Sequence, residues 1–114
     1  MTSETHHPDH LLDLRDTLRE FAAARHWGEY HTPKNLAMAL IVEAAELVEH
    51  FQWATPAQSC TLSPEKAGEV RDEVADVLIY LIEIADALNI DLIAAARDKI
   101  AKNALKYPQG LKFP

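Results

Sequence analysis

Apolar residues recur every three or four positions along most of this chain. In the first such stretch, over 11–26, Leu11, Leu14 and Leu18 fall on one side of a helix and most of the charged side chains on the other. This spacing is typical of an amphipathic helix that rests on a core through one face. The pattern predicts a first helix over 11–26, ended by Gly28.

Three further helices are predicted from their start signals. Thr32 and Ser63 each precede a proline, and Ser or Thr at the N-cap followed by proline at the first helical position favours a helix start. Asp91 supplies the third N-cap. The predicted helices cover 33–53, 64–89 and 92–106, and a surface loop over 54–63 joins the first two of them.

The predicted helix over 64–89 carries apolar residues on nearly every side, with Val74, Leu78 and Ile82 among them. A helix that is apolar all round is buried all round. Four helices of one short chain can hardly enclose one of their own members. We therefore expect part of this surface to meet a second copy of the chain, as a homo-oligomer.

Length and composition fit an all-α fold with one domain. The chain has 114 residues, of which 48% are apolar and 25% charged, and only three are Gly. One core is expected at this length, and the Gly-rich turns of a sandwich or barrel are missing. We expect a disordered segment over 1–10 and a single helical domain over 11–114, built as a four-helix bundle.

The net charge and the cysteine content limit the classes of partner and the cellular compartment that we expect. The formal charge is −7, so the field of the chain repels DNA and RNA polymers. Cys60 is the only cysteine, which fits a reducing compartment. The apolar runs fall short of the roughly 20 residues that cross a bilayer, and the first ten residues do not resemble a secretory signal. We expect a cytoplasmic protein that binds no membrane.

Two pairs of carboxylates stand out. Glu43 and Glu46 lie three residues apart in one predicted helix, and Glu73 and Asp76 repeat this spacing in another. No lysine or arginine occurs between Asn35 and Glu65 to compensate the first pair. Neighbouring acids on a helix repel each other, and a buried carboxylate must be protonated, ion-paired or bound to a metal. Each acid taken singly also fits an ordinary solvated helix face.

The two pairs together favour a metal site. All-oxygen carboxylate clusters suit Mg²⁺, with Mn²⁺ as the alternative, and these ions keep positions open for phosphate oxygens. A di-iron bundle would instead show Glu-x-x-His on two helices. None of the predicted helices carries that motif, so a carboxylate-bridged iron oxidase is the least favoured interpretation.

On these residues the sequence resembles the MazG-like, all-α nucleoside triphosphate pyrophosphohydrolases, and within them the dCTP pyrophosphatase branch. The signature motifs are Glu43-Ala44-Ala45-Glu46 and Glu73-Val74-Ala75-Asp76. Their surroundings, over 21–53, 72–86 and 99–108, carry the resemblance further. It implies a four-helix fold that assembles as a dimer or a dimer of dimers, and a Mg²⁺-dependent release of pyrophosphate from a nucleotide.

The resemblance also implies roles for individual residues. It makes Glu43, Glu46, Glu73 and Asp76 the metal ligands, and we assign the proton-accepting role to Glu46. It places the nucleobase among Trp27, His31, Asn35, Trp53 and Tyr80. The indole faces offer stacking surfaces, while His31 and Asn35 can read polar edges. Both tryptophans also fit hydrophobic core at helix ends.

Positive charge is concentrated near the C-terminus. The resemblance implies that Lys99, Asn103 and Tyr107 contact the phosphates or the sugar. These contacts could be made in the residues' own subunit or in the site of a neighbouring subunit. Lys102 and Lys106 fit equally well as cations that complement a helix dipole. The family often has Arg where Lys106 stands, and lysine lacks the bidentate geometry of a guanidinium.

The expected substrate is a nucleoside triphosphate, dCTP or a modified dCTP, and the expected role is cleansing of the nucleotide pool. The alternative is a non-catalytic helical module whose apolar helix serves oligomerisation or regulation. Nucleotide-dependent stabilisation separates the two, because a ligand that binds only the native state raises its apparent stability.

Overall fold

The three predicted N-caps all form in the structure, a computed structural model that describes residues 10–110. The Thr32 hydroxyl accepts a hydrogen bond from the backbone N–H of Asn35 at 3.2 Å, and the Ser63 hydroxyl accepts one from Lys66 at 3.1 Å. The Asp91 carboxylate accepts one from Ala94 at 3.0 Å. These caps satisfy backbone donors that have no partner within the helix.

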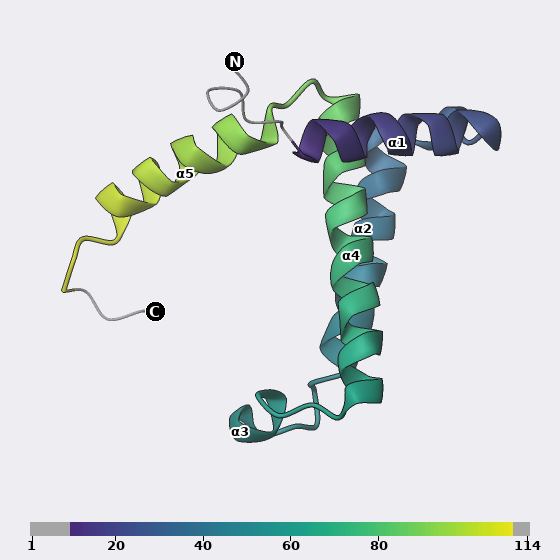
Figure 1. The fold of residues 1–114 in the computed structure, drawn as a ribbon. Coiled ribbons are helices and arrows are strands. Elements are labelled where there is room, and N and C mark those ends of the chain that lie inside the picture. Colours follow the sequence, from purple (N-terminus) through teal and green to yellow (C-terminus); the bar gives the residue numbers. More distant parts are fainter. Residues whose placement is uncertain (1–9, 111–114) are drawn as a thin grey trace, which may run out of the picture.

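The elements that follow are all helical. No strand occurs within residues 10–110, which confirms the all-α prediction. The elements, in chain order, are α1 His10–Ala24, the 3₁₀ helix η2 Gly28–Tyr30, α2 Pro33–Glu49, α3 Pro56–Ser59, α4 Pro64–Ala87 and α5 Leu92–Lys106 (Figure 1). α1 includes His10, and the expectation of disorder for the nine residues before it lies outside the described part of the chain.

Two local details differ from the sequence-based expectations. α2 ends at Glu49, about a turn before the predicted Trp53, and continues as turns in which the backbone N–H of Phe51 bonds to the carbonyl of Val48. The predicted loop contains the short helix α3. There Thr55 and Gln58 form a capping box, in which each side chain bonds the backbone N–H of the other residue.

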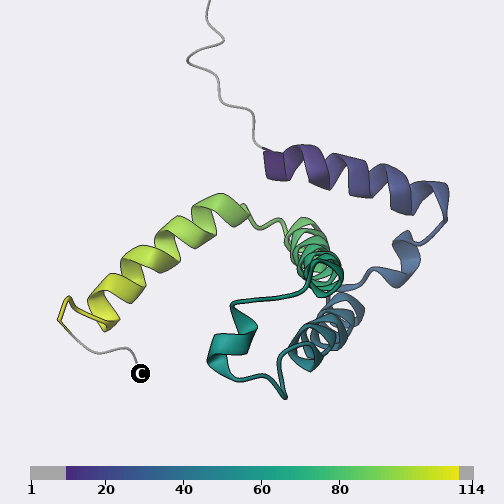
Figure 2. The same ribbon diagram turned by 60° about the horizontal axis from the view of Figure 1, so that its bottom comes forward.

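The helices pack unevenly. α2 and α4 lie side by side along most of their length, and α1 crosses the C-terminal part of α4 (Figures 1 and 2). α5 extends away from this group and makes at most slight contact with any other described helix. Within residues 10–110, the buried core is correspondingly small and consists of Leu36, Ile82 and Ala85.

A bidentate ion pair fastens α1 onto α4. Arg19 Nε donates to Asp86 Oδ2 at 2.9 Å, and Arg19 Nη2 donates to the other carboxylate oxygen. The guanidinium holds the pKa of Asp86 below its usual range, chiefly through these hydrogen bonds. The pair fixes the place where α1 crosses α4 and so shapes the space between them.

α4 is less enclosed within one chain than its all-round apolar character predicts. Val74 keeps about half of its surface exposed, and Leu78 and Leu81 are also exposed. None of the described helices is long and apolar enough to cross a membrane. The exposed apolar side chains of α4 are therefore free to meet another protein surface.

Candidate functional site

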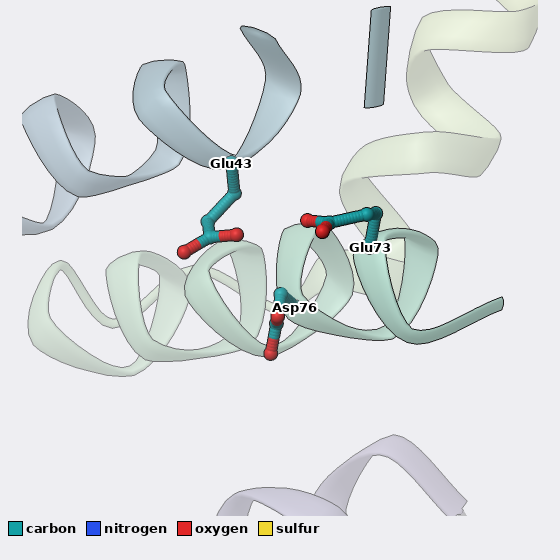
Figure 3. A group of neighbouring side chains, drawn as sticks. All are labelled: Glu43, Glu73 and Asp76. Atoms are coloured by element: carbon teal, nitrogen blue, oxygen red, sulfur yellow. The ribbon is translucent and has the colours of Figure 1, made fainter. Parts of the chain in front are cut away.

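Three of the predicted metal-ligand side chains converge between α2 and α4. Glu43 projects from the middle of α2 toward α4, and Glu73 and Asp76 project from successive turns of α4 (Figure 3). One carboxylate oxygen from each lies within 4.8 Å of the others. Spacing of three residues places Glu73 and Asp76 on one helix face, and packing of α4 against α2 brings that face to Glu43.

These carboxylates are poorly compensated. Glu43 Oε2 and Glu73 Oε2 are buried and have no hydrogen-bond partner. Burial raises the pKa of Glu43 to about 7, and the neighbouring Glu46 carboxyl adds to the rise. Burial, followed by the charge of Glu46, also raises the pKa of Glu73. No ion pair of the described chain involves any of these acids.

This electrostatic situation fits a divalent cation. Buried carboxylate oxygens without a partner lose their hydration and gain no compensating interaction. A bound metal ion would supply that interaction. The donor set consists of carboxylate oxygens alone, which suits Mg²⁺ or Mn²⁺ and not a soft metal. Glu43, Glu73 and Asp76 are therefore the residues that can hold such an ion.

Glu46, the fourth predicted ligand, stands beside the group of three. It is half-buried, lies one turn after Glu43 on α2, and acts on the pKa values of both Glu43 and Glu73. The structure therefore brings three predicted ligands into one group and leaves the fourth within electrostatic reach.

Tyr80 connects the acidic group to the next turn of α4. Its side chain is half-buried, one helical turn beyond Asp76. Burial raises the pKa of the Tyr80 phenol, and the charges of Glu43, Glu83 and Asp76 raise it further. The hydroxyl of Tyr80 therefore lies in the field of the acids on both sides of it.

His31 and Trp27 lie together beyond Tyr80. Their ring centroids are 6.3 Å apart, and His31 Nδ1 lies 2.9 Å from Glu83 Oε2. Asn35 is exposed, and its Nδ2 donates to the Tyr30 carbonyl at 3.0 Å. One end of the α2–α4 pair thus gathers several of the residues predicted to hold the base.

Glu83 is the residue that the sequence reasoning missed. Burial raises its pKa, while the nearby His31 lowers it. The available signal was its position: Glu83 follows Asp76 by seven residues, which places both on one face of α4. Its partner His31 comes from a distant segment, so the pairing depends on how that segment docks.

Four predicted site residues are not brought to the acidic group by this chain. The Trp53 side chain is 89% exposed, in the turns that follow α2. Lys99, Asn103 and Tyr107 lie on α5 or at its C-cap, away from the α2–α4 pair (Figure 1). Within one chain, the site therefore consists of acids and aromatic groups without the predicted lysine.

The chain is similar to proteins of known name. It is 40% identical over 103 residues to dCTP pyrophosphatase 1 of Homo sapiens, covering 89% of this chain and 61% of that protein. It is 39% identical over 100 residues to dCTP pyrophosphatase 1 of Rattus norvegicus, covering 86% of this chain and 59% of the relative. The chain thus spans about three fifths of the length of the curated relatives it matches.

The fold also matches a solved structure. A pyrophosphatase from Archaeoglobus fulgidus superposes with a TM-score of 0.84 at 46% sequence identity, covering 91% of this chain and 97% of that one. The MazG-like family matches residues 38–112, which include all four acids of the two motifs. On this match and these relatives, the chain belongs to the MazG-like family.

Proposed function

We propose that this protein is a Mg²⁺-dependent nucleotide pyrophosphohydrolase that converts dCTP or a modified dCTP into the monophosphate and pyrophosphate. The role would be to clear such nucleotides from the pool. The observation that carries the proposal is the convergence of Glu43, Glu73 and Asp76, with two buried oxygens that lack a partner. The names of the relatives and of the structural neighbour support the reaction class and the substrate.

In this proposal Glu43, Glu73 and Asp76 hold the cation, with Glu46 completing the set. A divalent cation supplies positive charge to phosphate oxygens and increases the acidity of the attacking water. Glu46 lies outside the group of three but close enough to affect the pKa of Glu43. One of its carboxylate oxygens would therefore take the proton of that water. The α2–α4 packing fixes the relative positions of all these groups, which lowers the entropic cost of the reaction.

The base would lie beyond Tyr80, beside Trp27 and His31. The indole face supplies a stacking surface, and the imidazole supplies a polar contact for the base edge. The amide of Asn35 keeps its oxygen available, because its nitrogen donates to Tyr30. Trp53 would reach a base only through a rearrangement or from a neighbouring copy, because it is almost fully exposed here.

The same proposal makes the active form a dimer or a dimer of dimers. Met38, Ile41 and Val42 are exposed on α2, and Val74 and Leu78 are exposed on α4, so the α2–α4 pair presents apolar side chains to solvent. Burial against a second copy would cover them. Lys99, Asn103 and Tyr107 on or next to α5 would then reach the phosphates or sugar in the partner's site.

Pyrophosphate release from a panel of ribo- and deoxynucleoside triphosphates, with Mg²⁺ and again with EDTA, tests the proposal. We expect cleavage of dCTP or its modified forms that EDTA abolishes. Release from no nucleotide, together with no shift of the melting temperature on adding Mg²⁺ and dCTP, would instead support a non-catalytic oligomerisation module.

A further inference from the structure

A cavity of about 280 Å³ lies where α1 and η2 face the C-terminal half of α4. Its wall includes Leu18 and Ala22 from α1, Gly28 from η2, and the polar side chains of His31 and Glu83. Apolar walls with a few polar groups at one edge are typical of small-molecule compartments. The cavity is therefore built to take a mostly flat, partly apolar group whose polar edge faces His31 and Glu83.

The cavity stands in register with the acidic group. Glu83 lies seven residues after Asp76 on the same face of α4, which is about 10 Å along the helix axis. Tyr80 lies between them and is influenced by carboxylates on both sides. A nucleotide with its phosphates at the acids and its sugar near Tyr80 would place its base in this cavity.

Glu83 controls which nitrogen of His31 carries hydrogen. The Nδ1 to Oε2 distance is 2.9 Å, and the two side chains are only 27% and 14% exposed. When Glu83 is ionised its carboxylate only accepts hydrogen bonds, so Nδ1 is then the nitrogen that carries hydrogen. In a neutral imidazole the other nitrogen, Nε2, is then an acceptor.

The polar edge of the cavity is consequently made of acceptors. Glu83 and Nε2 of His31 accept, while the two arginines that also line the cavity hold carboxylates of their own. Arg19 binds Asp86 in a bidentate manner, and Arg15 donates to Asp16. An acceptor edge complements the exocyclic amino group of cytosine and opposes the O4 carbonyl of uracil or thymine.

We propose that Glu83 is a positioning residue that sets base selectivity: it accepts the Nδ1 hydrogen of His31 and thereby makes Nε2 an acceptor for an exocyclic amino group. This inference rests on the proposed function and deepens it. It assigns a preference for amino-bearing over keto-bearing pyrimidines to a carboxylate outside the two metal-binding motifs.

The first test compares Glu83→Gln with the wild type in the full chain, using kcat/KM for dCTP and for dUTP at about pH 8, where an ordinary imidazole is neutral. A glutamine amide can donate to Nδ1 as well as accept, so His31 gains access to the Nε2–H tautomer that bonds a carbonyl. We expect kcat/KM to fall for dCTP and to rise for dUTP, which lowers their ratio by about tenfold. Glu65→Gln, at an exposed position in the first turn of α4, is the matched control and should leave the ratio unchanged.

A second measurement does not depend on turnover. The ¹⁵N resonances of the His31 imidazole, assigned by their loss in His31→Asn, report which nitrogen carries hydrogen. We expect the Nδ1–H tautomer in the wild type and a mixture in Glu83→Gln. An Nε2–H tautomer in the wild type, or an equal fall of kcat/KM for both nucleotides in Glu83→Gln, would overturn the inference.

The outcomes separate this inference from the proposed function. Wild-type protein that hydrolyses no nucleotide would remove both. Wild-type protein that cleaves dCTP, with a dCTP/dUTP ratio that Glu83→Gln does not change, would remove the role of Glu83 and leave the proposed function intact.

Discussion

The α2–α4 pair and α5 are marked by equally clear helix-start signals in the sequence, but they differ in how well they pack against the rest of the chain. Both α4 and α5 begin at a side-chain cap, at Ser63 and Asp91. α4 then packs against α2, and this packing brings the acids of both helices together. Within residues 10–110, α5 makes no comparable packing contact, and Ile100 is 68% exposed.

Local sequence signals therefore determine where a helix forms, whereas only packing between helices determines whether a site forms. The acidic group forms because apolar residues on α2 and α4 hold two carboxylate-bearing faces together. The polar residues of α5 have no such counterpart in the part of the chain that the structure describes. Under the proposed function, a site that needs both regions would be complete only if a second copy supplied α5.

The largest effect is expected at the acids. Glu43→Gln or Asp76→Asn removes one charged oxygen donor from the metal group, and we expect kcat/KM with saturating Mg²⁺ to fall by at least about 100-fold. The measurement is pyrophosphate release, with circular dichroism to verify folding. Glu65→Gln on the same helix is the control, and activity of Glu43→Gln equal to that of the control would show that the metal assignment is wrong.

A smaller loss is expected on α5. Lys99→Ala removes a cation that would face the phosphates, and we expect KM to rise about tenfold while the oligomer persists.

Ile100→Asp places a charge on the exposed apolar surface of α5 and should dissociate the oligomer. Sedimentation velocity reads the mass in both cases, and a wild-type monomer would contradict the division between the two regions.

Mixed assemblies sharpen this test. When Glu43→Gln and Lys99→Ala chains are co-expressed with different tags, one site of each heterodimer combines the acids of the second chain with α5 of the first. At a substrate concentration below the wild-type KM, we expect that heterodimer to be more active than either parent. A heterodimer no more active than either parent would mean that α5 serves its own chain.

Much of the fold was predictable because its signals are local. Thr32, Ser63 and Asp91 each cap the helix that the sequence indicated, since a cap depends on residues only three positions away. The end of α2 was predicted about a turn too late, because no proline or glycine marks it and the turns after Glu49 keep helix-like hydrogen bonds.

Part of the candidate site was likewise predictable from the sequence, and part was not. The grouping of Glu43, Glu73 and Asp76 was predictable because two uncompensated acid pairs on two helices favour a shared cation site. The pairing of His31 with Glu83 was not, because it depends on how the segment around η2 docks on α4. Spacing within one helix carries no information about such a contact between distant segments.

A pH effect on stability is expected from the α2–α4 pair in the absence of metal. The pKa of Glu43 is about 7 in the native state, above its ordinary value of 4.5, so the native state binds more protons between these values. The contribution of Glu43 protonation to the free energy of unfolding is therefore fully present below the ordinary pKa of 4.5 and is lost as the pH rises through the native pKa of about 7. In EDTA we expect the melting temperature to fall between about pH 5 and about pH 8.

Mg²⁺ should reduce this pH dependence, because the bound cation compensates the ionised acids. Glu43→Gln should reduce it as well, because the amide does not ionise. Differential scanning fluorimetry in buffers of matched ionic strength provides the measurement. A melting temperature in EDTA that rises over this range would contradict the assigned protonation of the group.

The smallest effects separate the two regions by their helix caps. Ser63→Ala removes the cap of α4, and we expect the free energy of unfolding to fall by about 1 kcal/mol at every protein concentration, because α4 packs within its own chain. Asp91→Ala removes the cap of α5, which packs closely against no other described helix and under the proposed function would pack against a second copy. Its effect should therefore depend on protein concentration and fade where the oligomer dissociates. Urea unfolding at two concentrations on either side of dissociation distinguishes these cases, and an equal loss for Asp91→Ala at both would place the partner of α5 in its own chain.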